Sequence, residues 1–556
     1  MNVTVMRAVT IVSLVALALG PIACGGASPE AVELAPAIDT IREDDLRADL
    51  FFLASDPLAG RLAGTAEAAI TSEFIKSRFE RLGLTPAGPD GTYFQDFELA
   101  SFALGEGNAL IVGGVAGIEA RRRAPGDDWH PLNVSASTTG KGGLVYAGFG
   151  IVDSRRGFDD YQGARAAGKI VLVLDGEPGA DDPESPFDGV VTAEASRDWR
   201  KALAAQERGA AGILFVRDVH NRPDTDDYQR ASESYWSEDR RVPRYSLEVW
   251  ADKVEIPVAR ISASLAEQLV AGAGKPLAEL AAAAETETGH GVLELPGPDI
   301  EIVASVERRA TPARNVVATI PGTDPTVADE VVIICAHFDH DGANEGGVFN
   351  GADDDGSGTV ALLEIAEAYS VAAAMGEGPR RTILLAAWDA EERGLLGAWY
   401  YTERPLFPLG QTVATLNMDM LGRNEEVPPE GGNRFRGLQP QTAESNANAI
   451  NIMGYSHSAD MRSQIEEANQ RIGLDLKFRY DNNESNLLRR SDHWPFLQVG
   501  VPAVFFHTGL HPDYHTYRDT ADKINYPKLQ NIARLVYLTS WNLANQEGRP
   551  ALDRDL

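Results

Sequence analysis

The sequence predicts an α/β protein, a three-layer α/β/α unit around a mostly parallel sheet, with a smaller β-rich region inserted into it. From about residue 300 onward, short apolar runs alternate with helical stretches, as expected for a largely parallel sheet. A second group of strand-like runs lies earlier, between about residues 138 and 272. The chain has 556 residues, which is too long for one ordinary compact domain.

The first residues have the pattern of an export signal. Arg7 precedes a short apolar run, 8–19, and small residues follow before Cys24. This run is too short to span a membrane. The stretch Pro21–Cys24 resembles a bacterial lipobox, in which the cysteine is lipidated, and a plain signal peptide cleaved nearby is the alternative. We therefore expect residues 1–24 to be a signal peptide of lipoprotein type. The protein would then be exported, either lipid-anchored at Cys24 in the cell envelope or secreted.

Residues 25–38 read as a linker, and residues 39–130 as the first part of the α/β unit. Apolar residues at helical spacing predict two helices between about residues 39 and 84, the second ended by Gly83. Gly60 and Arg61 lie in the loop between them, which we interpret as structural.

The region 138–272 contains strand-like runs separated by glycines and one short helix. The expected strands are Gly143–Tyr146, Gly168–Leu174, Ala211–Val216 and Ile256–Ile261, and the expected helix is Lys201–Arg208. We expect these elements to form a small β-rich domain.

The region 300–545 carries the parallel sheet. Its expected strands are Val331–Ala336, Thr382–Trp388, Val413–Asn417 and Ala503–Phe506, with helices such as Thr359–Tyr369 and Ala459–Ile472 between them. In sheets of this kind, functional groups gather beyond the carboxyl ends of the strands.

Imidazoles and carboxylates follow these strands repeatedly. The groups in question are His337-Phe338-Asp339, the triplet Asp353-Asp354-Asp355, Glu391-Glu392, Met418-Asp419 and Tyr514-His515. Nitrogen and oxygen ligands of this kind suit Zn²⁺. Two neighbouring ions need a bridging carboxylate and several acidic ligands to offset their repulsion, and two histidines with three acids meet that requirement.

In order, spacing and residue type, these motifs resemble the zinc aminopeptidase family M28. The likeness covers about residues 300–540, and residues 40–130 to a lesser degree. It implies two zinc ions for each chain. One zinc would be held by His337 and Asp419 and the other by Glu392 and His515, with Asp354 bridging them.

The same resemblance implies the catalytic roles. Glu391 would be the general base, which takes a proton from the metal-activated water and passes it to the leaving amine. Tyr514 would donate a hydrogen bond to the developing oxyanion. Asp339 would fix the orientation of His337.

The strands and helix of region 138–272 resemble, in their order, the protease-associated domain, a module often inserted in exported peptidases. We expect it to restrict the access of large substrates.

Other interpretations of single motifs are weaker. Asp353-x-Asp355-x-Ser357-Gly358, followed by Glu364, matches an EF-hand calcium loop, but the Gly-rich residues before it do not predict an incoming helix. Ser491-Asp492-His493 cannot form a serine triad, because contiguous residues cannot converge on one another. His507 and His511 lie near His515, and the Tyr-His-Thr context favours His515 as the ligand. Cys335 is expected in the core.

Composition narrows the function further. The net charge is −32, which disfavours binding to nucleic acid and to anionic lipid. The resemblance to family M28 implies a peptide as the partner and the activity of an aminopeptidase. A carboxypeptidase acting on acidic dipeptides and a receptor without catalysis remain alternatives on the same scaffold. A glutaminyl cyclase is disfavoured, because that branch uses one zinc and the full ligand set is present here.

Overall fold

The structure is a computed structural model that describes residues 35–114, 121–163, 166–180, 182–185, 187, 189–222, 228–237, 240 and 242–553. The predicted signal peptide, the lipid anchor at Cys24 and most of the predicted linker lie outside the described residues. Residues 36–556 form one compact unit, to which the following description applies.

The larger sheet has four parallel strands at its centre. These are β18 (Thr382–Trp388), β15 (Val331–His337), β19 (Thr412–Met418) and β22 (Ala503–His507), in that spatial order. The prediction of these four parallel strands is confirmed. The flanking strands are antiparallel to them: β14 (Val306–Ile320) pairs with β18, and β20 (Ala449–Met453) pairs with β22. Beyond β20, β21 (Asp475–Phe478) completes that edge of the sheet.

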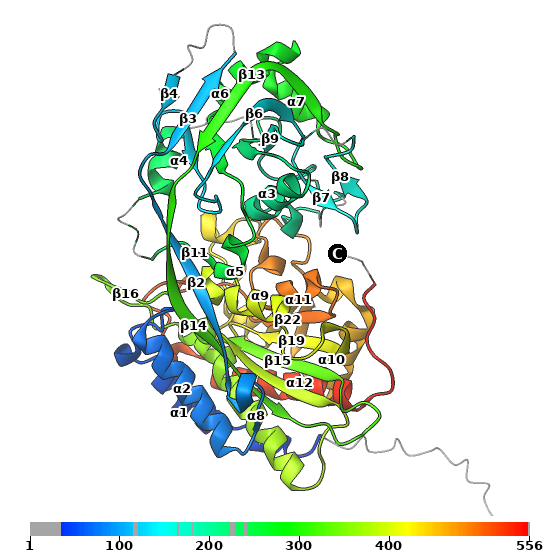
Figure 1. Ribbon diagram of the computed structural model, residues 1–556. Helices are drawn as coiled ribbons and strands as arrows, with labels where there is room; N and C mark the ends of the chain where they lie inside the picture. Colours follow the sequence, from blue (N-terminus) through cyan, green and yellow to red (C-terminus); the bar gives the residue numbers. More distant parts are fainter. Residues whose placement is uncertain are drawn as a thin grey trace, which may run out of the picture. The chain divides into compact units, whose positions relative to one another are not determined.

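Helices cover both faces of this sheet, as predicted (Figure 1). On one face lie α8 (Gly358–Ala374) and α12 (Tyr526–Asn545), with α1 (Glu43–Leu53), α2 (Ala66–Arg81) and α10 (Ala459–Ile472) packed beside them. On the other face lie α9 (Leu396–Glu403) and α11 (His493–Gln498). All seven residues of β15 are buried, Cys335 among them, because both faces of the strand are covered.

A second sheet of eight strands has the order β4-β3-β13-β6-β9-β10-β12-β5. Its members are β3 (Ala109–Gly113), β4 (Arg121–Arg123), β5 (Trp129–Pro131), β6 (Thr139–Tyr146), β9 (Ile170–Leu174), β10 (Gly212–Val216), β12 (Val258–Ile261) and β13 (Leu293–Val303). The predicted domain boundaries therefore need correction at both ends. β3, β4 and β5 were expected in the first part of the larger unit, and β13 lies beyond residue 272. Sheet membership depends here on a pairing between β3 and β13, which are far apart in sequence.

The chain enters and leaves the second sheet through one antiparallel ribbon. β2 (Phe94–Leu104) pairs with β14 from Phe94–Val316 to Leu104–Val306. We call the residues between these two strands, 105–305, the insertion. A hydrogen bond joins the two ends of the insertion at its base: the Ser305 N–H donates to Asn108 Oδ1 at 2.7 Å.

The insertion also contributes to the larger sheet. Its strand β11 (Tyr245–Leu247) pairs with β2 as an edge strand. Trp250 of the following helix α5 (Glu248–Ala251) stacks on Trp199 of α3 (Asp198–Glu207), with ring centroids 4.7 Å apart. Trp250 also meets Trp399 of α9 edge-on at 5.7 Å. These three indoles join the insertion to the helical layer over the larger sheet.

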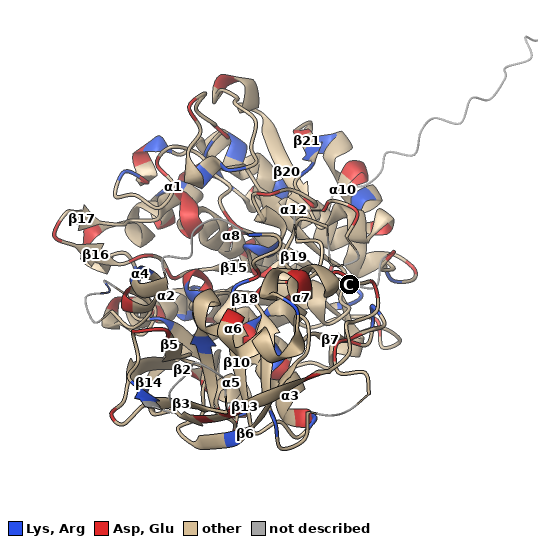
Figure 2. Ribbon diagram, turned by 90° about the horizontal axis from the view of Figure 1, so that it is seen from above, with Lys and Arg blue, Asp and Glu red and all other residues tan. Residues whose placement is uncertain are grey.

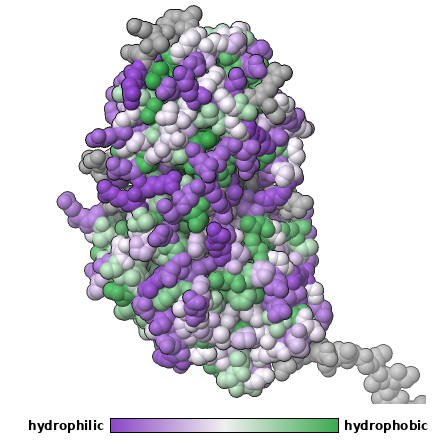
Figure 3. All heavy atoms as spheres, viewed as in Figure 1, coloured by the Kyte–Doolittle hydropathy of each residue, from purple (hydrophilic) through white to green (hydrophobic). Residues whose placement is uncertain are grey.

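The surface mixes both signs of charge despite the negative total. Lys and Arg are interspersed with Asp and Glu along the helices and loops (Figure 2). On the face drawn in Figure 3, hydrophobic residues form small patches among hydrophilic ones. None of the helices in the described ranges is long and apolar enough to cross a membrane.

Candidate active site

The chemical groups lie at the carboxyl ends of the four central strands. His337 is the last residue of β15 and lies beside Trp388, the last residue of β18. Glu391 follows β18, and Asp419 follows β19 directly. His515 lies in the loop after β22. Parallel strands bring these ends to one edge of the sheet, so residues separated by up to 180 positions meet there.

Three residues around the site have left-handed backbone, which is uncommon for side chains other than glycine. They are Ala390 (φ 58°), Met420 (φ 58°) and His515 (φ 52°). Two of them adjoin Glu391 and Asp419, and the third is a predicted ligand itself. Strained backbone of this kind gathers at functional sites, where the surrounding structure holds it in place.

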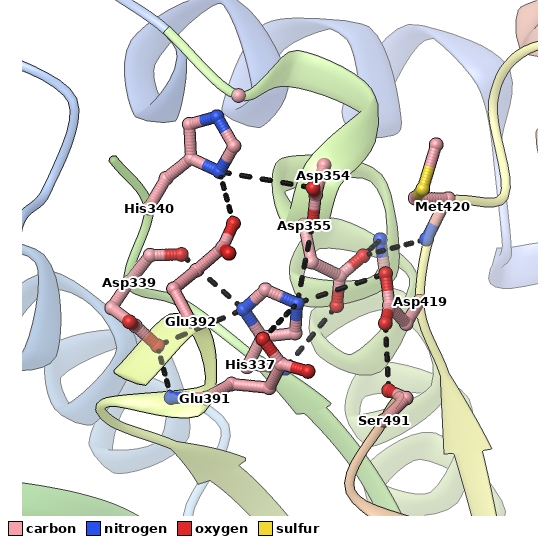
Figure 4. A network of polar contacts seen from close by, with 12 residues as sticks. His337, Asp339, His340, Asp354, Asp355, Glu391, Glu392, Asp419, Met420 and Ser491 are labelled. Atoms are coloured by element: carbon pink, nitrogen blue, oxygen red, sulfur yellow. Dashed lines mark hydrogen bonds and ion pairs between the residues drawn. The ribbon is translucent and has the colours of Figure 1, made fainter. Parts of the chain in front are cut away.

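Asp354 lies between two imidazoles. Its Oδ1 is 3.4 Å from His337 Nε2, and its Oδ2 is 3.0 Å from His515 Nε2. The carboxylate thus faces one histidine with each oxygen, as a bridging ligand must. Figure 4 shows Asp354 and His337 within the surrounding network.

The remaining predicted ligands divide between the two histidines. Asp419 Oδ1 lies 3.6 Å from His337 Nε2, and Glu392 Oε2 lies 3.3 Å from His515 Nε2. The structure therefore brings all five predicted ligands together, in the two groups that the sequence predicted. Asp355 also lies beside His337 and Asp419. Its Oδ1 accepts the N–H groups of Gly358 and Met420 and its Oδ2 that of His337, so it supports the loop and Asp354 is the better bridge.

Neighbouring side chains orient these ligands. Asp339 Oδ1 lies 3.7 Å from His337 Nδ1 and accepts the N–H of Glu391 at 2.9 Å, so it positions both residues. Ser491 donates to Asp419 Oδ2 at 2.6 Å, which leaves Oδ1 toward His337. Contacts of this kind fix the orientation of metal ligands.

The donor set fits a divalent metal ion. His337 Nε2 and Asp419 Oδ1 are buried and have no hydrogen-bond partner among the described residues. Such groups are costly unless something else satisfies them, and nitrogen and oxygen donors of this type suit Zn²⁺.

The electrostatics of the site also favour a cation. Burial lowers the pKa of His337, but the carboxylates of Glu391, Asp339, Asp354 and Asp419 outweigh it, and the pKa is raised well above 6.5. Burial also lowers the pKa of His515. Neighbouring carboxylates, led by Glu392, outweigh this effect, and the pKa of His515 is raised well above 6.5. A field strong enough to hold a proton on both imidazoles also attracts a metal ion, which would displace those protons.

The two predicted catalytic residues lie at this centre. Glu391 Oε2 is 3.7 Å from His337 Nε2, and burial raises the pKa of Glu391 well above its ordinary 4.5. Tyr514 lines the adjoining cavity, with its ring centroid 4.0 Å from that of His515. Burial raises the pKa of the Tyr514 phenol, so the group remains a hydrogen-bond donor at neutral pH.

Sequence reasoning missed two residues that contact the predicted ligands. His340 is fully buried, and its Nδ1 lies 2.7 Å from Glu392 Oε1 and 3.9 Å from Asp354 Oδ2. Asp341 Oδ2 lies 3.3 Å from His515 Nδ1, on the side of the ring opposite the cluster. Both follow Asp339 directly, so the length of the polar run after β15 was the signal that could have identified them.

Arg61 has a definite structural role. Its guanidinium is buried and donates to four backbone carbonyls, those of Leu53, Phe338, Asn350 and Gly351, at 2.6–2.8 Å. Two of these carbonyls belong to the loop that leads to Asp354. Arg61 therefore ties the loop after α1 to the metal-ligand loops, and the structural interpretation of Gly60-Arg61 agrees with these contacts.

The other candidate histidines, and Glu364, make contacts that do not include the side chains of the predicted ligands. His507 Nδ1 lies 3.1 Å from the carbonyl of Asp419, and His511 Nε2 lies 3.2 Å from Asp353 Oδ2. Glu364, the last residue of the EF-hand pattern, accepts the N–H of Arg42 through Oε2 at 3.1 Å. A calcium loop is therefore not formed by that pattern.

A cavity of about 300 Å³ opens beside the cluster. Its wall includes the acids Asp354, Glu391, Glu392 and Asp419, together with apolar and basic residues. The latter are Leu395, Met420, Leu487, Phe505, Leu510, Arg197, Arg489 and Arg490. Arg197 belongs to the insertion, so both parts of the chain line this cavity.

The chain is similar to several known proteins. Residues 315–540 match the family model described as Peptidase family M28. The chain is 31% identical over 276 residues to a probable glutamate carboxypeptidase of Arabidopsis thaliana, covering 48% of this chain and 35% of that protein. It is 28% identical over 266 residues to a probable zinc metalloprotease of Pyrenophora tritici-repentis (strain Pt-1C-BFP), covering 42% of this chain and 52% of that protein. The alignments thus span about a third to a half of these curated relatives. Among solved structures, an aminopeptidase from Aneurinibacillus sp. strain AM-1 aligns with a TM-score of 0.47 and 18% identity, over 93% of this chain and 97% of that chain.

Proposed function

We propose that the chain is a two-zinc aminopeptidase that removes N-terminal residues from peptides, and the match of residues 315–540 to the model described as Peptidase family M28 supports this. The observation that carries this proposal is the position of Asp354, whose two oxygens face His337 and His515 separately. A single ion would not need a carboxylate shared between two imidazoles.

We assign one ion to His337, Asp354 and Asp419, and the other to Asp354, Glu392 and His515. Zinc bound there supplies Lewis acidity toward the scissile carbonyl and lowers the pKa of the attacking water. The carboxylate of Asp341 would hold the ring of His515 in the orientation that turns Nε2 toward the cluster.

Glu391 then acts as the base and, in the second step, as the acid. It takes the proton of the attacking water and delivers it to the leaving amine. The hydrogen bond from its N–H to Asp339 fixes its backbone, and burial raises its pKa well above 4.5, which makes the carboxylate a stronger base. The Tyr514 phenol would donate a hydrogen bond to the oxyanion that develops on the former carbonyl oxygen.

A carboxypeptidase is the second candidate. Three arginines line the cavity, and the relative from Arabidopsis thaliana carries the name of a probable glutamate carboxypeptidase. Arginine is the side chain best suited to bind a carboxylate, which every peptide C-terminus carries.

We also propose that the insertion narrows the entrance to the site. Asn482 Nδ2 donates to the carbonyl of Pro183 at 2.9 Å, and its Oδ1 accepts the N–H of Val190 at 2.9 Å. These bonds support a position for the 182–197 segment beside the cavity, where only the end of a peptide chain would enter. Export, with Cys24 as the lipid anchor, remains a proposal that fractionation of cells producing the tagged protein and its Cys24→Ala variant can test.

The function is tested by measuring the metal content and the activity of the purified protein together. The protein is expected to hold about two zinc ions for each chain and to cleave aminoacyl amides with a free N-terminus but not N-acetylated ones. The Glu391→Gln variant should keep its zinc and lose activity by at least about 10²-fold. Cleavage only of N-acetylated peptides from their free C-terminus would instead establish the carboxypeptidase, and zinc-loaded protein without hydrolysis would refute both.

A further inference from the structure

Three arginines lie in the wall of the cavity that also contains the predicted metal ligands. Arg197, Arg489 and Arg490 all line it, together with Tyr514 and His515. This is unusual in a chain with a net charge of −32, where acidic residues are the more common. Two arginines are adjacent in sequence, and the third comes from the insertion almost 300 residues earlier.

The charges of the cavity do not balance once the metal ions of the proposed function are bound. The four acids of the wall, Asp354, Glu391, Glu392 and Asp419, carry four negative charges at most. Two zinc ions carry four positive charges and offset them. The charge of Arg197 is offset by its ion pair with Glu194, so Arg489 and Arg490 leave the cavity positive.

The three arginines differ in what they contact. Arg197 Nε lies 2.6 Å from Glu194 Oε2, and Arg489 donates a hydrogen bond to the carbonyl of Thr192. These contacts hold both guanidinium groups at the rim where the insertion meets the larger sheet. Arg490 is exposed, and within the described ranges its side chain makes no hydrogen bond or ion pair. Its guanidinium group is therefore available to bind a ligand in the cavity.

We infer that this wall is a carboxylate-binding subsite and that the enzyme prefers peptides with a carboxylate next to the scissile bond. Arg490 binds the carboxylate, and Arg489 adds to the positive potential. The inference rests on the proposed function for the position of the scissile bond. The carboxylate has two sources: the side chain of an acidic residue at the cleaved end, or the free C-terminus of a short peptide.

The Arg490→Gln variant tests the inference against substrates that differ only in one charge. One pair is Glu-X and Gln-X peptides with an amidated C-terminus, and the other is the same Gln-X peptide with a free and an amidated C-terminus. For the carboxylate-bearing member, the variant should raise KM by about 10- to 100-fold with little change in kcat, as expected for a lost charged hydrogen bond. The neutral member should be unaffected. Dependence in the first pair identifies a side-chain carboxylate, and dependence in the second identifies the C-terminus.

Arg436→Gln is the matched control. It removes the same charge from a side chain that is 69% exposed and absent from the cavity wall. Equal effects of Arg490→Gln on charged and neutral substrates, or equal effects of the two variants, would overturn the inference while the peptidase function stands. Calorimetry of glutamate and glutamine binding to the zinc-loaded protein makes the test independent of turnover. Glutamate is compared with glutamine for a side-chain carboxylate, and glutamine with its α-amide for a C-terminal one. Tighter binding of the carboxylate-bearing member of either pair that is lost in Arg490→Gln supports the subsite even if no peptide is cleaved, and equal binding within both pairs refutes it.

Discussion

The guanidinium of Arg61 donates a hydrogen bond of 2.8 Å to the carbonyl of Gly351, three residues before Asp354. Gly351 has a left-handed backbone (φ 54°), and a Cβ there would lie 2.5 Å from the ring of His340. The loop that carries Asp354 is thus shaped from two sides, by a buried cation on one and a buried imidazole on the other. Both contacts come from residues that are not themselves predicted ligands.

Replacing Arg61 should destabilise the whole fold. Arg61→Ala leaves four buried carbonyls without a donor and removes a buried positive charge that lies near Asp339 and Asp355. We expect a loss of about 3–5 kcal/mol in the free energy of unfolding, measured by urea titration of the metal-free protein. Arg61→Lys keeps the charge but not the planar guanidinium that donates to several carbonyls at once, so the loss in unfolding free energy should be smaller than for Arg61→Ala. Arg436→Ala should change little, and an equally small loss for Arg61→Ala would contradict the role assigned here.

Counting the bound zinc ions can distinguish a bridging role of Asp354 from a role as ligand to one ion only. Asp354→Asn should lower the zinc content from about two ions to well below one, because both ions lose a shared charged ligand. His515→Ala should retain about one ion, since only one group of ligands contains His515. Elemental analysis after dialysis against zinc-buffered solution gives both values. Loss of the same number of ions in both variants would argue against a bridge.

Loss of His340 should weaken zinc binding at the site that contains Glu392 and His515 more than at the site that contains His337. It lies 2.7 Å from Glu392 Oε1, so His340→Ala removes a group that orients or joins the ligands on that side. Residues in this position typically change metal affinity by about 10- to 100-fold. Competition with a chromophoric zinc chelator measures the two dissociation constants. His457→Ala, another buried histidine outside the site, is the control for general damage to the core.

Glu364 gives a stability change with pH whose sign can be stated. Burial raises the pKa of Glu364 from 4.5 to about 7 in the folded protein. The folded state therefore holds this proton more tightly than the unfolded state. The stabilisation is present below pH 4.5 and is lost as the pH rises toward 7.

Glu364→Gln removes this titration. The difference in unfolding free energy between wild type and variant should shift by about 3 kcal/mol across that pH range, in favour of the variant at the higher pH. Glu367→Gln, one turn away on α8 with a side chain 27% exposed, should show a much smaller shift. A constant difference between wild type and Glu364→Gln from pH 4.5 to 7 would show that Glu364 does not titrate in this way.

Metal affinity should fall steeply as the pH is lowered. Carboxylates raise the pKa of both His337 and His515 well above 6.5, so each ion must displace protons from its ligands. Proton release on zinc binding, measured by calorimetry in two buffers of different ionisation enthalpy, should be greater than zero at neutral pH. Asp419→Asn should reduce the release, because the pKa of His337 then falls. Zinc binding without proton release would contradict the protonation of the free site.

The sequence by itself determined the central strands and identified the candidate ligands that the structure brings together. Thr382–Trp388 and Ala459–Ile472 have the bounds that the sequence predicted, because continuous apolar runs and helical periodicity are local signals. The polar residues after each strand were recognisable for the same reason, and parallel strands made their convergence a consequence of topology.

Only the tertiary structure decided how distant segments complete this core. The assignment of β3 and β13 to the second sheet depends on a pairing across almost 200 residues, for which the sequence carries no local signal. The same holds for Arg61 beneath Gly351, His340 beside Glu392, and Arg197 in the wall of the cavity with Arg490. Each of these contacts joins separate elements, so it exists only after the sheets and loops have packed.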